Sequence, residues 1–189
     1  DRWFASDGGP AARHALLAHD YWDVDQADGR SSAAMLAMLE RLHGLAAAGR
    51  DLTIRAYQPS DRRPTGFDQS YYEVDMARLL IDAAAVRPEA SVLALGGSLH
   101  AMKTFSTRHG FLFAAGHLKP AHVRSLVVAH QGGSVWACFG PTRADCGVRE
   151  LSVGFDPARR GVILEIQQDG AWDGLLALGP TTASPPAAR

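Results

Sequence analysis

The sequence has little excess charge of either sign, because 19 Lys and Arg residues nearly balance 20 Asp and Glu residues and leave a formal net charge of -1. No stretch gathers Lys or Arg together with aromatic residues, as nucleic-acid surfaces do. Long apolar runs are also missing, since none approaches the roughly 20 residues that span a bilayer. The first residues show neither a charged leader nor a hydrophobic segment. We therefore expect a soluble chain with no nucleic-acid partner and no transmembrane segment.

Familiar catalytic signatures are missing as well. The chain contains no HExxH, no pair of CxxC motifs, no P-loop and no GxGxxG. It also lacks the GxSxG turn that carries the nucleophile of many serine hydrolases. Around Ser98, His100 stands at the position of the motif's second glycine. The usual serine hydrolase is therefore not expected.

Cysteine is scarce, but its two copies are close together. Cys138 and Cys146 flank the turn-rich segment 140–145. This spacing suits a disulfide that closes a short loop, which the chain-entropy model values at about 2 to 3 kcal/mol. Two unrelated reduced cysteines are the alternative, and a zinc site would need more ligands than this neighbourhood offers. We expect the disulfide, and with it a periplasmic or secreted location.

Hydrophobic periodicity predicts a first helix after an irregular entry. Residues 1–30 show little periodicity. From Ser31 the pattern changes, because apolar residues then recur at helical spacing, namely at Met35, Met38, Leu39, Leu42, Leu45 and Ala46. Ser31 or Ser32 would cap this helix, and Gly49 would stop it.

A second helix is predicted from Ser70, which forms a capping-box pattern with Glu73, to the residue before Pro88. Alternating apolar residues predict a strand over 52–57, and a continuous apolar run predicts a strand buried on both faces over 91–96. We expect the two strands to be parallel neighbours in one sheet, joined by this helix in a right-handed crossover.

The second half of the chain is richer in strands, which are predicted at 123–129, 135–139, 148–153, 162–166 and 175–178. Gly132 and Gly133 would turn an antiparallel hairpin between the first two. The fold class is therefore α/β, with a partly parallel central sheet flanked by helices and an antiparallel C-terminal extension. We expect a single domain over residues 1–180 and a flexible tail over 181–189.

His100 is the leading candidate for a functional side chain. Ligands of open α/β sheets bind beyond the carboxyl ends of the strands, and His100 follows the predicted strand 91–96 after Gly96 and Gly97. The glycines permit a sharp turn or a close approach to a ligand, and an imidazole serves as a metal ligand or as a general acid or base. A hydrogen-bonded structural histidine is the alternative.

Arg30 is a second candidate. It lies in segment 28–32, which precedes the first predicted helix. A helix cap explains Ser31 or Ser32, but a cation at a helix N-terminus opposes the helix dipole. We therefore consider Arg30 for an ion pair or for contact with an anionic ligand, with plain capping of the helix as the alternative.

Three segments, taken in order, resemble the C-terminal part of the erythromycin-esterase/ChaN/Tiki/TraB superfamily. They are residues 28–35 (DGRSSAAM), 75–77 (DMA) and 92–101 (VLALGGSLHA). Within the last segment, Gly97 to His100 fits the superfamily's GxxH motif. Residues 132–138 look like a later element of bacterial members, so the resemblance covers roughly residues 20–150.

The resemblance implies an α/β core with a polar cleft in which His100 takes part. Members known to act are varied, since Tiki-like proteins resemble metal-dependent proteases, erythromycin esterases open a macrolactone, and ChaN-like proteins bind haem. This sequence departs from the family at two points. The Gly-Glu-x-His motif of the first strand does not occur before residue 28, so we expect that strand and its share of the site to be missing. Tyr71-Tyr72-Glu73 stands where the family's helix begins with Arg.

The leading hypothesis is a metal-dependent hydrolase that acts on an ester or amide in a small-molecule or peptide ligand. A divalent metal held by His100 would activate water, or His100 would act as the general base. The residues expected at the site are His100, Glu73 and Arg30 for catalysis, and Tyr72, Gly96 and Gly97 for ligand or cofactor binding. The alternatives are a haem- or iron-binding protein with His100 or Tyr72 as axial ligand, and a degenerate member with only a structural role.

Overall fold

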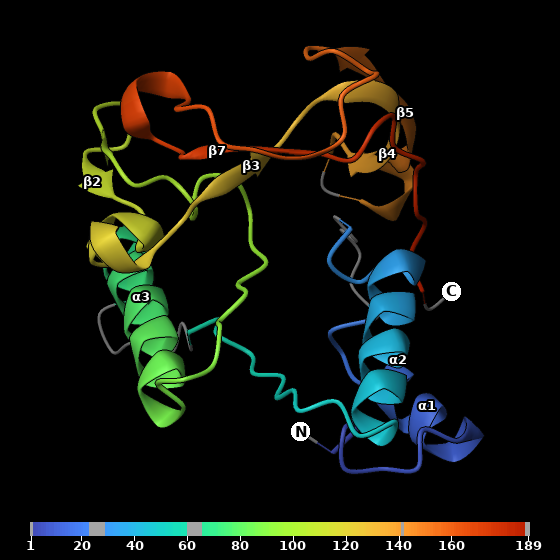
Figure 1. Cartoon of the computed structure of the whole chain (residues 1–189). Helices are drawn as coiled ribbons and strands as arrows, with labels where there is room; N and C mark the ends of the chain where they lie inside the picture. Colours follow the sequence, from blue (N-terminus) through green and yellow to red (C-terminus); the bar gives the residue numbers. More distant parts are fainter. Residues whose placement is uncertain (1, 23–28, 60–65, 141, 188–189) are drawn as a thin grey trace. The chain divides into compact units, whose positions relative to one another are not determined.

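The computed structural model describes residues 2–22, 29–59, 66–140 and 142–187. Contacts within the chain separate two compact units. The first unit contains residues 1–54, 130–157 and 179–189, and the second contains 55–129 and 158–178. Figure 1 labels their elements along the chain. The expectation of one domain over residues 1–180 stays a prediction.

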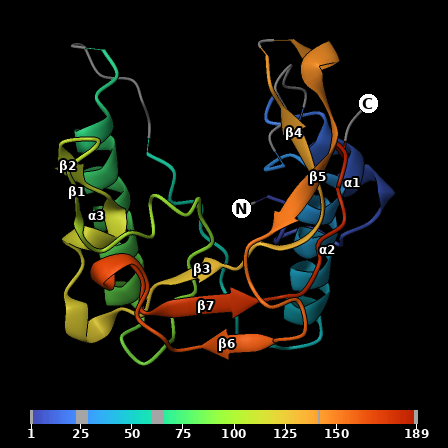
Figure 2. The same ribbon diagram turned by 90° about the horizontal axis from the view of Figure 1, so that it is seen from above.

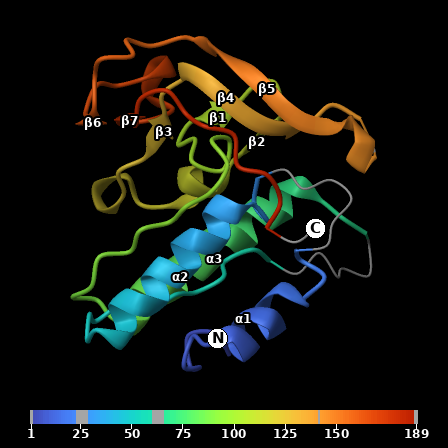
Figure 3. The ribbon, with the colours of Figure 1, turned by 90° about the vertical axis from the view of Figure 1, so that its right-hand side faces the viewer.

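The first unit contains helices α1 (Pro10–Leu17) and α2 (Ala33–Ala47). The expected helix is α2, and its cap is confirmed, because the side chain of Ser32 accepts a hydrogen bond from the N–H of Met35. The prediction of an irregular entry was wrong, because Pro10 starts α1, a position where its missing N–H costs no hydrogen bond. The two helices are joined by an ion pair of 2.8 Å between Arg13 and Glu40 and are seen together in Figure 3.

A long hairpin completes the first unit. Strands β4 (Gln131–Cys138) and β5 (Cys146–Val153) pair antiparallel, with Cys138 opposite Cys146. The predicted disulfide between these two cysteines is confirmed. The short 3-10 helix η3 (Arg143–Asp145) lies within the connection.

The predicted turn at Gly132 and Gly133 was wrong, because both glycines lie inside β4. Both have positive φ, and a Cβ atom on Gly133 would lie 2.1 Å from the carbonyl oxygen of Thr181. Thr181 donates its N–H to Gly132 and accepts from Ser134, so the C-terminal segment pairs with the strand here in an isolated parallel bridge. The glycines therefore admit the close approach of a second backbone segment. Farther along this segment, which we expected as a flexible tail, Ala187 donates its N–H to Ser31.

The second unit contains the longest helix, α3 (Gln69–Val86), which confirms the second predicted helix. The predicted capping box was wrong, because the carboxylate of Asp68 caps the helix by accepting from the N–H groups of Ser70 and Tyr71. Glu73 is thereby free of a capping role and is buried. Beside it, Met76 and Ala77 form a small core with Ala114, against which Tyr57, Tyr72 and Leu118 pack.

The strands of the second unit are short. In the larger sheet, β7 (Gly174–Ala177) lies between β3 (Leu126–Val128), to which it is parallel, and β6 (Gly161–Ile163), to which it is antiparallel; Figure 2 shows the three side by side. Strands β1 (Phe105–Ser106) and β2 (Phe111–Leu112) form a separate antiparallel pair. Three short 3-10 helices are η1 (Ala114–His117), η2 (Pro120–His122) and η4 (Gln168–Gly170). The chain is thus mixed α and β, with a partly parallel sheet.

Two predicted strands are wrong. The structure forms no strand over residues 52–57 or 91–96, so the expected parallel pair and crossover do not exist among the described residues. Leu93 in the middle of the second segment is 96% exposed. The predicted hairpin of 123–129 with 135–139 is also wrong, because β3 pairs with β7 and β4 pairs with β5. None of the described helices combines the length and apolar character needed to cross a membrane.

Candidate functional site

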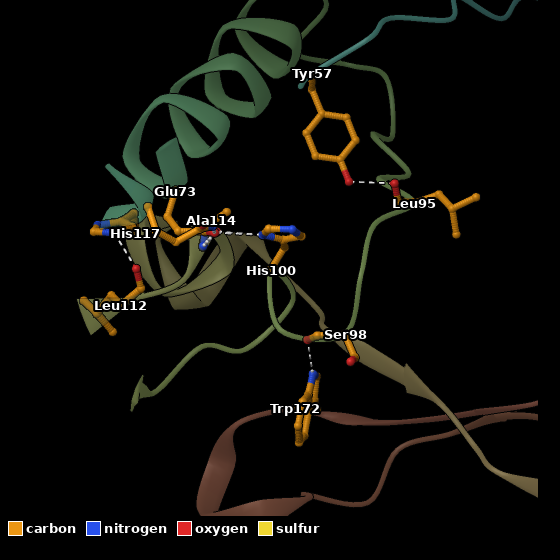
Figure 4. Close-up of polar contacts among 10 residues, drawn as sticks. Tyr57, Glu73, Leu95, Ser98, His100, Leu112, Ala114, His117 and Trp172 are labelled. Atoms are coloured by element: carbon orange, nitrogen blue, oxygen red, sulfur yellow. Dashed lines mark hydrogen bonds and ion pairs between the residues drawn. The ribbon is translucent and has the colours of Figure 1, made fainter. Parts of the chain in front are cut away.

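His100 belongs to a turn of the second unit that is tied at several points. The N–H of Ala101 donates to the carbonyl of Ser98, at 3.2 Å, and the indole N–H of Trp172 donates to the same carbonyl, also at 3.2 Å. The backbone carbonyl of His100 accepts from the N–H of Ala115 in η1, at 2.9 Å. Figure 4 shows this turn below the end of α3. The imidazole is therefore carried by a backbone fixed on two sides.

The imidazole of His100 meets the carboxylate of Glu73. Its Nδ1 lies 2.9 Å from both carboxylate oxygens. Figure 4 shows the two side chains facing each other. Because a carboxylate only accepts hydrogen bonds, Nδ1 carries the proton in this pair, and in the neutral imidazole Nε2 then keeps its lone pair. Nε2 has no hydrogen-bond partner among the residues that the structure describes.

Glu73 is held as firmly as the histidine it orients. Its side chain is completely buried, and its Oε2 accepts the N–H of Ala114 at 3.0 Å. The amide of Gln69, one turn earlier on α3, donates to Oε1. A buried carboxylate is tolerated when its oxygens are hydrogen-bonded, so Glu73 forms a preorganised support for His100.

A pocket of about 320 Å³ adjoins the imidazole, whose side chain is 30% exposed. The ring of Tyr72 lies 6.3 Å from that of His100 between centroids, and the ring of Phe113 meets it edge-on at 6.4 Å. The pocket, hereafter the smaller pocket, is lined by Gln58, Pro59, Phe67, Gln69, Tyr72 and His100. Tyr72, which the sequence analysis considered for ligand or cofactor binding, thus lies beside the histidine.

The two glycines that precede the histidine have different surroundings. A Cβ atom on Gly96 would lie 2.5 Å from the hydroxyl of Tyr57, which donates to the carbonyl of Leu95 at 2.7 Å. Burial, and next the nearby Tyr72, raise the pKa of Tyr57 above its usual value. A Cβ atom on Gly97 would make only an ordinary contact with the ring of His100. A side chain at position 96 would therefore displace the hydroxyl of Tyr57 from the carbonyl of Leu95.

Sequence reasoning missed Gln69 and the N–H of Ala114, both of which hold Glu73. Gln69 lies one helical turn before Glu73, and a signal for the pair existed in this spacing. Ala114 carried no signal, because any residue supplies a backbone N–H. Arg30 belongs to the first unit, where it is exposed and its carbonyl accepts from the hydroxyl of Tyr21. Its expected approach to His100 stays a prediction.

The donor set around His100 bears on the expected metal. Catalytic zinc sites use three protein ligands and a water, and no group of three or more His, Cys, Asp or Glu side chains in the described residues could hold a metal ion. His100 offers one ring nitrogen, while both oxygens of Glu73 already accept hydrogen bonds. This set does not fit the divalent metal, and we derive no step through it.

Comparisons of the chain with protein-family models, with curated proteins and with solved structures found no match. Membership of the erythromycin-esterase/ChaN/Tiki/TraB superfamily therefore stays a prediction, which rests on residues 28–35, 75–77 and 92–101. The assignment of a function starts from the geometry of Glu73 and His100.

Proposed function

We propose that Glu73 and His100 form the general acid–base centre of a hydrolase that acts on an ester or amide. One observation carries the proposal: a fully buried carboxylate, itself held by Gln69 and Ala114, fixes Nδ1 of a partly exposed histidine beside a pocket. Such support suits a group that transfers protons, because its tautomer and orientation are set before the substrate arrives.

The chemistry follows from the free lone pair on Nε2. His100 would take a proton from a water as that water adds to the substrate carbonyl, and would return the proton to the leaving oxygen or nitrogen as the tetrahedral intermediate collapses. Glu73 accepts the Nδ1 proton throughout and stabilises the imidazolium that forms between the two steps. Tyr72 lines the smaller pocket and offers a phenol beside the developing oxyanion.

Matched variants test this proposal. His100→Gln removes the base, and Glu73→Gln keeps the shape of the support without its charge. We expect a loss in kcat/KM on the order of 10² to 10⁴-fold for the first, and a smaller loss for the second, measured on p-nitrophenyl acetate and a p-nitroanilide. His14→Gln, an exposed histidine on α1, is the control and keeps wild-type rates. Wild-type rates in His100→Gln and Glu73→Gln, as in the control, would reject the proposal.

A haem-binding protein without catalysis is the second candidate, and the same pair favours it. An imidazole whose Nδ1 is held by a carboxylate presents Nε2 as an iron ligand. Titration with hemin distinguishes the two functions: a Soret shift that saturates at one equivalent and is lost in His100→Gln, together with no esterase activity, would replace the hydrolase. Loss of folding in His100→Gln, seen by circular dichroism, would instead assign His100 a structural role.

A further inference from the structure

A second, larger cavity of about 540 Å³ also includes His100 in its lining. One wall is the side of α3 formed by Met76, Leu80, Ile81 and Ala84, and another is the segment Val92–Ala94. Leu118, Val123 and Leu126 add further apolar side chains. Cavities of this size and apolar character are typical of sites for small organic ligands.

The charged side chains of this larger cavity are all of one sign. Its lining includes Lys119 and Arg124, together with His117 and His122, but no Asp or Glu. Asp173, which accepts from the backbone N–H of Ser125, is paired with Lys103 and lies near enough to Arg124 for that charge to lower its pKa. Lys119 is thus the cation at the border of the cavity for which the lining offers no acidic side chain.

Part of the cavity wall is unusually uncovered for its composition. Leu93 is 96% exposed, Ile81 52% and Val92 48%. The run that contains Val92 and Leu93 has the pattern of a segment buried on both faces. Exposed apolar side chains that line one cavity are typical of a ligand-binding groove.

We propose that the larger cavity binds an acyl chain with an anionic head group, such as a fatty-acid carboxylate. The chain packs along α3 and Val92–Ala94 and covers their apolar side chains. The carboxylate pairs with Lys119, with Arg124 nearby, and supplies the negative charge that the acid-free lining lacks. This ligand goes beyond the proposed function, because the cavity binds the free carboxylate whether or not His100 hydrolyses an ester.

Dodecanoate is the probe, and isothermal titration against the full chain is the measurement. We expect one site per chain, with dodecanoate at least tenfold tighter than the uncharged dodecanol, because only the carboxylate pairs with the cations. Lys119→Glu combined with Arg124→Glu removes this preference, and Leu93→Ser weakens binding of both compounds. Arg50→Glu, an exposed charge reversal in the first unit, is the control and leaves binding unchanged.

Three results would overturn the proposal. The first is equal affinity for dodecanoate and dodecanol, and the second is undiminished dodecanoate binding in the folded variant that carries both charge reversals. The third is a dimer, detected by light scattering, that Leu93→Ser dissociates, because the apolar wall would then bind a second copy of the chain. Glu73→Gln, a change outside the lining of the larger cavity, separates this proposal from the hydrolase. Dodecanoate binding that persists in this variant while turnover falls supports both, and binding by a wild-type chain without turnover supports the cavity alone.

Discussion

The hairpin of the first unit and the histidine site of the second are stabilised in different ways. Strands β4 and β5 are joined by a short connection, a ladder of backbone pairs that skips Gly132, and a disulfide. None of the described residues that form the site belongs to a strand. The site depends on one buried carboxylate, which links α3 to His100 and to η1. We therefore expect single substitutions to change the stability of the hairpin little, whereas the structure of the site depends on Glu73.

The largest expected effect is therefore at Glu73. Glu73→Ala leaves the N–H of Ala114 and the Nδ1–H of His100 without their acceptor, and it opens a cavity in α3. Each buried group left unpaired costs about 1 to 3 kcal/mol, so we expect a loss of about 3 kcal/mol or more in the free energy of unfolding. Hydrogen exchange should accelerate in α3 and η1 and stay unchanged in β4 and β5; equal acceleration in both units would contradict the comparison.

Removal of the disulfide is expected to affect the hairpin of the first unit and to leave the histidine site of the second unit unchanged. Cys138→Ser with Cys146→Ser should lower the free energy of unfolding by about 2 to 3 kcal/mol through the entropy of the unfolded loop. The effect should be confined to exchange in β4 and β5, with the Glu73–His100 pair unaffected. Thermal melts with and without reductant provide the check, since the wild type with reductant should reproduce the variant. A wild type indifferent to reductant would show that the hairpin needs no disulfide.

The cap of α2 should contribute less. Ser32→Ala removes the acceptor for the N–H of Met35, which costs about 1 kcal/mol at a helix N-terminus. Ser32→Asp keeps an acceptor and is the matched control. Chemical denaturation of the three proteins should place Ser32→Asp near the wild type; an equal loss in both variants would mean that the side-chain hydrogen bond is not what stabilises this end.

The smallest effect is confined to acid. Burial alone would raise the pKa of Asp173, but the hydrogen bonds from Lys103 and Ser125, with the charges of Lys103 and Arg124, outweigh it and lower the pKa. A carboxyl whose pKa is lowered on folding stabilises the protein above its unfolded pKa of about 3.9 and loses that contribution as pH falls through the folded value. Asp173→Asn should therefore flatten the stability curve below about pH 4. An unchanged acid limb would show that Asp173 is not linked to folding.

Sequence alone predicted features whose causes are local. The helices α2 and α3 follow from apolar spacing and nearby caps, and the disulfide follows from two cysteines across a turn. Residues 52–57 and 91–96 read as strands because of their side chains, but a strand also needs a partner, and none of the described residues pairs with them. Pairing is a property of two segments, so one segment's pattern cannot settle it.

Sequence reasoning singled out His100 and Glu73 but not the groups that hold Glu73. His100 was marked by its place after two glycines, and Glu73 by a capping-box pattern with Ser70 that the structure does not form. That Glu73 would be buried, and would hold Nδ1 with help from the N–H of Ala114, depends on a contact between residues 41 positions apart. No periodicity or motif encodes such a contact, because the donor is a backbone group.

The central claim is that Glu73 fixes the proton of His100 on Nδ1 and leaves Nε2 free for chemistry. Nitrogen-15 NMR of the protein with labelled histidines measures this directly, because in a neutral imidazole the protonated ring nitrogen and the unprotonated one have different chemical shifts. In the wild type we expect the His100 signals to show a protonated Nδ1 and an unprotonated Nε2. In Glu73→Gln we expect a mixture of the two tautomers, and the signals of His14 should be the same in both proteins. A wild-type signal with the proton on Nε2 would contradict the claim that Glu73 fixes the proton on Nδ1.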